Sequence, residues 1–286
     1  MSAIVGVHGI SQQQLGPSQL EATWKPALQD GLTFASGHSM SAPPLRMAFY
    51  GQLFMKITDK GAVTKGSEDW LQHLQGEELD DLLAAATEAV TVEEIEAARG
   101  QPAKKYTRVP LPLQAVLRSL DRRFGPSAGV LYLGELRQVR RYLHDTQLKE
   151  SVDAEVRGAI TSDCQVLIGH SLGSVVAFEY IRQHAEHQLA LFLTLGSPLG
   201  LRMVRRLMPD AHYGTAQGLP SNVATWVNVR DPRDPVACAG DLHVAWPGVT
   251  DRSRVDNEGD AHSVTRYLSK EETGRAVLAA LPGLVA

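Results

Sequence analysis

The five residues from Gly169 to Gly173, with the sequence Gly-His-Ser-Leu-Gly, constrain this chain more than any other segment. They follow an apolar run at 166–168 and precede another at 175–178, which predicts a sharp turn between a buried strand and a buried helix. A Gly-x-Ser-x-Gly turn in that context forces its serine into a strained backbone conformation, and the two glycines leave room for the tight fold. We therefore expect the hydroxyl of Ser171 to stand at the start of the helix. Taken without its surroundings, the motif is also compatible with an ordinary turn.

Strands and helices are expected to alternate on both sides of this turn. Apolar runs typical of buried strands lie at 3–7, 45–54, 166–168, 189–195 and 224–229, with a further edge strand at 242–246. Helical periodicity is found at 18–34, with Ser18 as the N-cap, and at 200–208 and 270–281. This alternation predicts an α/β fold with a mostly parallel central sheet and helices on both faces.

The segment at about 56–150 departs from the alternation and contains several helical patterns without a convincing strand. We interpret residues 1–286 as a single domain in which this segment is a helical insertion or cap. One of its apolar faces contains Tyr132, Leu136, Val139 and Leu143. The arginines of that helix are expected to form a solvated face rather than a recognition patch for an acidic substrate. The insertion could also form a lid over Ser171.

Composition excludes several classes of function. Hydrophobic residues make up 43% and charged residues 21% of the chain, as in ordinary globular proteins, and the formal net charge of -4 argues against nucleic acid as the partner. No apolar run is long enough for a membrane span and no targeting segment is recognisable, so a cytoplasmic protein is expected. Cys164 and Cys238 are expected to be small buried residues, neither a disulfide framework nor a catalytic thiol.

Three residues at the predicted carboxyl edge of the sheet have the chemistry of a catalytic triad. A serine hydroxyl is a poor nucleophile at neutral pH, so it needs a base and a third group that orients the base. Ser171, Asp234 and His262 occur in the chain order serine, aspartate, histidine, which is the order expected for a nucleophile elbow in a parallel sheet. We assign them as nucleophile, acid and base.

The acid and the base each have competitors in the sequence. Asp234 is preferred because the step Asp-Pro-Val would fix a sharp loop after the strand, and His262 is preferred because it follows a long loop just before a helix. The competing acids are Asp231, with less weight Asp241 and Asp260, and the competing bases are His243 and His212.

Attack on an acyl carbon places negative charge on oxygen, which oriented backbone N–H groups stabilise. Leu172 is the candidate for one such donor, and Ile10, in the loop after the first strand, is the candidate for the second. The sequence contains no zinc-type spacing, no phosphate-cradling glycine loop and no dinucleotide fingerprint, so neither a metal nor a cofactor is expected.

These motifs together resemble the α/β-hydrolase superfamily, in particular its lipase- and esterase-like members. The matching segments are Val7-His8-Gly9-Ile10, Gly169-His170-Ser171-Leu172-Gly173, Thr194-Leu195-Gly196-Ser197-Pro198, Asp234-Pro235-Val236 and His262. The resemblance implies that they are the oxyanion loop, the nucleophile, the loop after the next strand, the acid and the base. It also implies hydrolysis of a carboxylic ester through an acyl-enzyme. The chain departs from the family pattern by starting at what would be the third strand, and in its long insertion.

The expected partner is a small-molecule or acylated substrate. Alternatively, the same site could act as a peptidase or amidase, a thioesterase or an acyltransferase, or the fold could be a binding module without catalysis. The sequence does not indicate which residues bind the substrate.

Overall fold

A computed structural model of the protein describes residues 3–10, 12, 15–41, 43–54, 69–99, 106, 109–209 and 219–284. Its centre is a six-stranded sheet with the order β2-β1-β3-β4-β5-β6, in which every neighbouring pair of strands is parallel. The strands are β1 (Ile4–Val7), β2 (Leu45–Ala48), β3 (Val166–His170), β4 (Leu191–Leu195), β5 (Trp226–Val229) and β6 (Thr250–Arg252). The predicted fold class, an α/β protein with a parallel sheet and a helical insertion, is confirmed.

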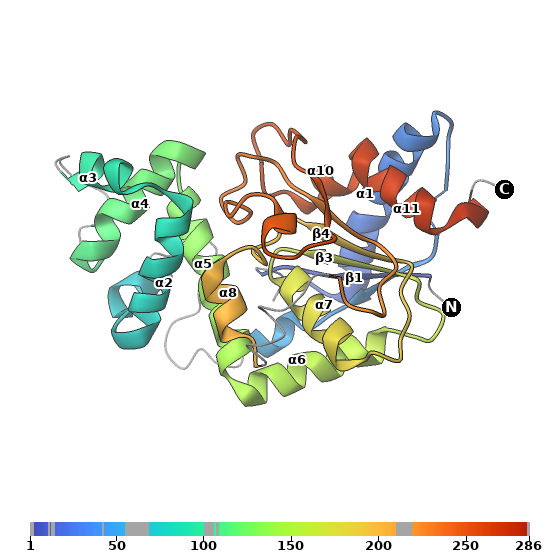
Figure 1. Ribbon diagram of the computed structural model, residues 1–286, viewed down its shortest axis with the longest axis horizontal. Helices are drawn as coiled ribbons and strands as arrows, with labels where there is room; N and C mark the ends of the chain where they lie inside the picture. Colours follow the sequence, from blue (N-terminus) through green and yellow to red (C-terminus); the bar gives the residue numbers. More distant parts are fainter. Residues whose placement is uncertain are drawn as a thin grey trace.

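Helices cover both faces of the sheet (Figure 1). One layer consists of α1 (Pro17–Ser36), α10 (Val264–Leu268) and α11 (Glu271–Ala280), and the opposite layer of α6 (Thr146–Ala159) and α7 (Leu172–Gln183). Side chains on the strands alternate between the two layers, because successive residues of a strand point to opposite faces. Ile4 and Val166 therefore pack toward α1 and α11, while Val5 and Leu167 pack toward the other layer.

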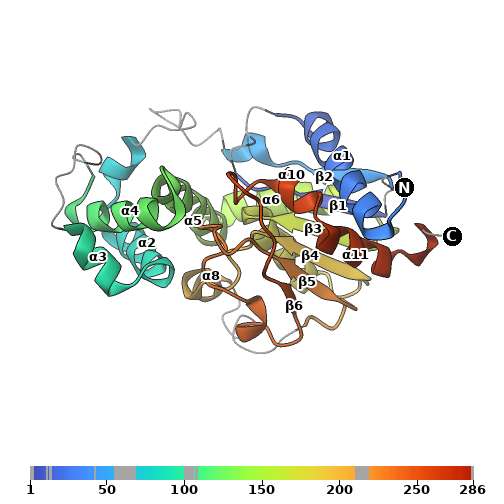
Figure 2. The ribbon, with the colours of Figure 1, turned by 90° about the horizontal axis from the view of Figure 1, so that it is seen from above.

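The helical insertion lies beside the sheet rather than on one of its faces (Figures 1 and 2). Its described helices are the 3-10 turn η2 (Asp69–His73), α2 (Gly76–Ala89), α3 (Val92–Arg99), α4 (Leu111–Phe124) and α5 (Ala128–His144). Their apolar side chains join the same buried cluster as α6 and α7. Helix α5 contacts α6, α7 and α8 (Arg202–Leu207), so it is the helix through which the insertion reaches the site edge of the sheet. The expected end of the insertion, residue 150, falls inside α6.

Three local predictions are wrong. The edge strand is Thr250–Arg252, within the long loop expected before His262, whereas residues 242–246 contain the 3-10 turn η3 (Leu242–Val244). The backbone N–H groups of Leu242 and His243 each donate a hydrogen bond of 2.9 Å to the Asp251 carboxylate, and these two bonds hold that turn. The second strand ends at Ala48 and is followed by the 3-10 turn η1 (Gly51–Phe54).

The third error concerns the start of α1, which begins at Pro17 with Gly16 as N-cap, two residues before the expected N-cap Ser18. The Gln19 side chain accepts the Gly16 N–H at 3.0 Å, as in a capping box. The chain closes with the 3-10 turn η4 (Pro282–Leu284). Within the described ranges, no helix has both the length and the apolar character that crossing a membrane requires.

Candidate active site

Ser171 occupies a strained turn between β3 and α7. Its backbone angles are φ 53° and ψ -128°, a combination that is costly for any residue with a side chain. The turn is fixed from both sides: the Ser171 N–H donates to the Leu195 carbonyl at 3.1 Å, and the Ser174 N–H donates to the Ser171 carbonyl at 2.9 Å. The sharp turn expected from the Gly-His-Ser-Leu-Gly motif is therefore present.

The glycines of the motif allow the backbone segments to approach closely. A Cβ atom on Gly173 would lie 2.1 Å from the Val7 carbonyl oxygen, and one on Gly169 would lie 2.5 Å from the Cα of Ser174. The loop after β1 approaches just as closely, because a Cβ on Gly9 would lie 2.9 Å from the Cβ of Ser171. The glycines thus bring the loop that contains Ile10 against the serine.

We expect Gly173→Ala to destabilise the fold, since the added methyl group meets backbone atoms that cannot rotate away. The expected loss in the free energy of unfolding is at least about 3 kcal/mol. Gly158→Ala is the matched control: it lies in α6, and nothing stands within 4 Å of its added Cβ. The control should be neutral or stabilising by up to about 1 kcal/mol. Denaturant titration of both variants measures the difference, and equal stabilities would contradict the close approach.

His262 and Asp234 form a direct contact at the same edge of the sheet. The Nδ1 atom of His262 lies 2.9 Å and 2.8 Å from the two carboxylate oxygens of Asp234. Asp234 follows β5 and is fully buried, and it also accepts hydrogen bonds from the Tyr267 hydroxyl at 2.7 Å and the Val236 N–H at 2.9 Å. The loop after β4 closes over the pair, because a Cβ on Gly196 would lie 2.6 Å from an Asp234 oxygen.

Asp231, the main competitor of Asp234, holds the surrounding loops instead of His262. Its carboxylate accepts from the backbone N–H groups of Arg233 at 2.8 Å and Asn257 at 2.6 Å. The guanidinium of Arg233 adds an ion pair at 3.2 Å. These donors occupy both carboxylate oxygens of Asp231, which links the loop after β5 to the loop that leads to His262.

The other competitors lie elsewhere or act from a distance. Asp241 pairs with Arg230 at 3.0 Å, and His243 contacts Asp251 at 2.9 Å. Asp260 lies close enough to His262 to raise its pKa, but no hydrogen bond joins the two side chains. His212 lies outside the described residues.

The hydroxyl of Ser171 donates to a residue that sequence reasoning missed, Glu135 of α5. One carboxylate oxygen of Glu135 accepts the Ser171 hydrogen bond, while the other lies 3.8 Å from Nε2 of His262. That Nε2 atom is buried and has no hydrogen-bond partner within the described structure. The sequence contained a signal for this residue, because Glu135 is a charged residue on the apolar face of its helix, three residues after Tyr132 and next to Leu136.

The pKa values of Glu135 and His262 reflect their burial and their proximity. Burial raises the pKa of Glu135 to about 6, although nearby His262 and the hydrogen bond from Ser171 act in the opposite direction. Burial by itself would lower the pKa of His262, but the Asp234 and Glu135 carboxylates outweigh it and raise that pKa to about 9. At neutral pH this arrangement therefore favours an imidazolium that faces two carboxylates.

The two candidate oxyanion donors differ in what they contact. The backbone of Leu172, at the start of α7, lies close enough to the carboxylate of Glu135 to lower its pKa. Ile10 is half-buried, packs against the core cluster, and accepts a hydrogen bond from the Gln12 side chain through its carbonyl at 3.1 Å. Leu172 thus already faces a carboxylate beside Ser171.

His8 and His170 border the site, and each has a ring nitrogen that contacts a backbone carbonyl. Burial lowers the pKa of His8 to about 4 and that of His170 to about 3, so both imidazoles are neutral at physiological pH. Nδ1 of His8 lies 2.6 Å from the Gly9 carbonyl, and Nε2 of His170 lies 3.0 Å from the His262 carbonyl. Since a neutral imidazole is a donor at one nitrogen, both contacts fix the loops around the triad.

A cluster with metal-ligand chemistry lies near the far edge of the sheet. Asp241, His243 and Asp251 place their ligand atoms within 4.8 Å of one another. Arg230 and Ser253 already bind the Asp241 carboxylate, and Asn228 and two backbone N–H groups bind that of Asp251. We interpret the cluster as a connection between β5, β6 and η3.

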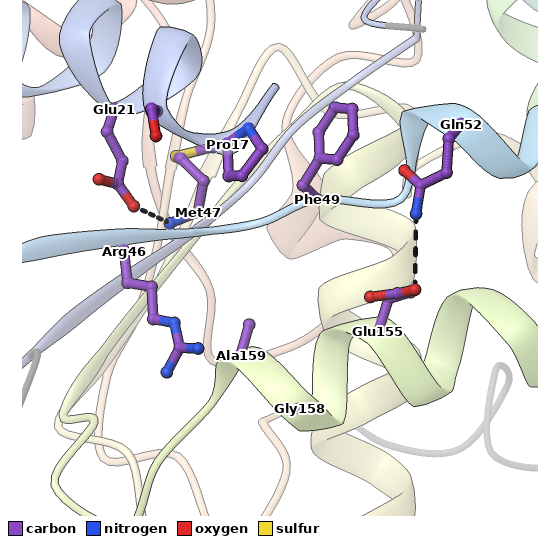
Figure 3. A pocket seen from close by; sticks show the side chains of 10 residues that line it. Pro17, Glu21, Arg46, Met47, Phe49, Gln52, Glu155, Gly158 and Ala159 are labelled. Carbon is purple, nitrogen blue, oxygen red and sulfur yellow. Dashed lines mark hydrogen bonds between the residues drawn. The ribbon is translucent and has the colours of Figure 1, made fainter. Parts of the chain in front are cut away.

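A surface pocket of about 450 Å³ lies between α1, β2, η1 and α6, and no triad residue lines it (Figure 3). Glu21 accepts the Met47 N–H at 3.3 Å, and the Gln52 amide donates to Glu155 at 3.5 Å, so two of the acidic side chains in its walls are paired. The lining residues are Pro17, Ser18, Glu21, Arg46, Met47, Phe49, Gln52, Glu155, Gly158 and Ala159.

Comparisons with models of known protein families, with curated proteins and with solved structures find no match for this chain.

Proposed function

We propose that the protein is a serine hydrolase of the α/β-hydrolase type that cleaves a carboxylic ester through an acyl-enzyme. The observation that carries the proposal is the meeting of three separate chain segments: a serine in a strained strand-to-helix turn, a histidine in contact with a buried aspartate, and a backbone N–H beside the serine. A parallel α/β sheet binds its ligands at the carboxyl ends of its strands, where all three segments lie.

In the proposed reaction, Ser171 attacks the ester carbonyl while Nε2 of His262 takes the hydroxyl proton. The backbone N–H groups of Leu172 and Ile10 stabilise the negative charge that develops on the carbonyl oxygen. His262 then passes its proton to the departing alcohol, leaving the acyl group on Ser171. Water, activated by His262, releases the acid in the second half of the cycle.

Asp234 has a supporting role in this scheme. Its carboxylate accepts a hydrogen bond from the Nδ1–H group of His262, which fixes the tautomer with a free Nε2 and stabilises the imidazolium that forms during attack. The hydrogen bonds from Tyr267 and Val236 keep the Asp234 carboxylate in place, so that its orientation does not depend on His262.

A fluorophosphonate probe with mass-spectrometric mapping of the adduct tests the proposal. We expect one adduct per chain, on Ser171, together with hydrolysis of short-chain p-nitrophenyl esters. Prior heat denaturation is the control, because labelling that depends on the assembled site disappears with the fold. An adduct on another residue, or no adduct at Ser171 either in the wild type or in variants that lack the carboxylate of Glu135, would refute a serine hydrolase.

A further inference from the structure

Helix α5 places a carboxylate where a substrate would have to react. Glu135 accepts the hydrogen bond of the Ser171 hydroxyl and contacts the backbone of Leu172, the two groups that should meet the reacting carbonyl. Ser171 is 0% exposed and Glu135 is 3% exposed. In this conformation, therefore, the insertion both covers the nucleophile and occupies the position of the oxyanion.

The same contact separates the nucleophile from its base. Proton transfer requires a hydrogen bond from the Ser171 hydroxyl to Nε2 of His262, but the hydroxyl donates to Glu135 and Nε2 has no hydrogen-bond partner in the described part of the chain. The histidine and aspartate are already aligned, so the contact with Glu135 is what leaves the set incomplete.

The charges around Glu135 favour this closed arrangement. Its carboxylate faces His262, which lies on the loop before α10 and supplies a positive charge next to Glu135 when it is protonated. Asp234, behind His262, and the Tyr50 hydroxyl, in the segment after β2, are the other titratable groups that interact with it. Because a carboxylate stabilises an imidazolium, Glu135 helps to keep His262 protonated and thus unable to act as a base.

Ion pairs and a hydrogen bond fix α5 in position. Arg140 of α5 pairs with Asp81 of α2 at 2.7 Å, and both side chains are almost fully buried. Asp81 also pairs with the exposed Arg206 of α8, a helix that contacts both α2 and α5. The Tyr132 hydroxyl donates to the Ala85 carbonyl at 2.8 Å. Glu135 is therefore held by the packing of the insertion against α8, in addition to its contacts with Ser171 and His262.

We propose that Glu135 is an autoinhibitory residue, a carboxylate that α5 of the insertion holds in the oxyanion position and that must withdraw before a substrate reaches Ser171. The inference rests on the proposed hydrolase function. A carboxylate is also the group that ester hydrolysis releases, so Glu135 binds the site as a tethered analogue of the product acid. A substrate gains access by replacing the contacts of Glu135 with Ser171, Leu172 and His262.

The test compares Glu135→Gln and Glu135→Ala with the wild type in the rate of fluorophosphonate labelling. Both variants should label roughly ten- to a hundredfold faster at neutral pH, because they lose a charge-assisted contact that competes with the probe. The glutamine variant keeps the shape of the side chain and removes only its charge, so it remains informative if the smaller alanine disturbs packing. Glu96→Gln, which removes an exposed carboxylate from α3 of the insertion, is the matched control and should label like the wild type.

The pH profile separates inhibition from a merely structural role. Without the negative charge of Glu135, the imidazolium of His262 is less stabilised, so its pKa falls. The acidic limb of the labelling rate should therefore move to lower pH in Glu135→Gln and stay in place in Glu96→Gln. Labelling of Glu135→Gln at the wild-type rate or slower, with an unmoved limb, would overturn the inference and leave the hydrolase intact. Absence of an adduct in all proteins would refute both.

Discussion

Replacing Ser171 by alanine is expected to lower kcat for ester hydrolysis on the order of 10⁶-fold, the size of effect seen when a nucleophile is removed from a serine hydrolase. The hydroxyl of Ser171 bonds only to Glu135 among the described side chains, and the turn itself depends on backbone contacts. The variant should consequently keep its fold. Steady-state kinetics with a p-nitrophenyl ester measure the loss, and far-ultraviolet circular dichroism measures the fold.

Ser197→Ala is the matched control for that experiment. Ser197 lies in the loop after β4 and is 3% exposed. Its hydroxyl forms a hydrogen bond of 2.7 Å with the hydroxyl of Ser174 and none with His262. It should retain turnover within about tenfold of the wild type, corresponding to about 1.4 kcal/mol. If Ser171→Ala retained turnover and Ser197→Ala lost it, the nucleophile would have to be reassigned.

Replacing Asp234 by asparagine is expected to lower kcat roughly 10⁴-fold, because an amide in this position no longer selects the tautomer of His262 that has a free Nε2. It also removes the charge that stabilises the imidazolium. The burial of Asp234 and its bonds from Tyr267 and Val236 should hold the asparagine in the same place. The comparison of kcat between the wild type and Asp234→Asn measures the effect.

Asp231→Asn distinguishes the two acids, since it changes an equally buried carboxylate in the same loop. Asp231 bonds to Arg233 and to the N–H of Asn257, so its replacement should lower the melting temperature while kcat falls much less than in Asp234→Asn. A large loss of kcat in Asp231→Asn together with an active Asp234→Asn would exchange the roles assigned to the two residues.

The pH dependence of wild-type turnover follows from His262. A general base must be neutral, and the pKa of His262 in the closed arrangement is about 9. Turnover should therefore increase as the pH rises from neutral toward about 9. For stability the sign is opposite: the folded state binds the proton of His262 more tightly, so this contribution is complete below pH 6.5 and is lost as the pH rises through about 9.

Local sequence determined the parts of this protein that depend on neighbouring residues. The strained turn at Ser171 follows from two glycines around a serine, since only their missing side chains let α7 approach β1 and β3. The parallel sheet follows from apolar runs separated by helical periodicity, because each run must be covered on both faces. Asp234 could be found because it follows a predicted strand, and His262 because it follows a long loop just before a predicted helix, at the same edge as the serine.

Tertiary structure decided which distant groups meet. The contact of His262 with Asp234 joins residues 28 positions apart, and the contact of Ser171 with Glu135 joins residues 36 positions apart. Glu135 lies on a helix whose pattern shows which face is buried but not what that face packs against. Periodicity acts over a few residues, whereas a contact between an insertion and a sheet edge is set by packing of the whole chain. The sharp turn at Ser171 could therefore be predicted from the sequence, whereas the contact of its hydroxyl with the carboxylate of Glu135 could not.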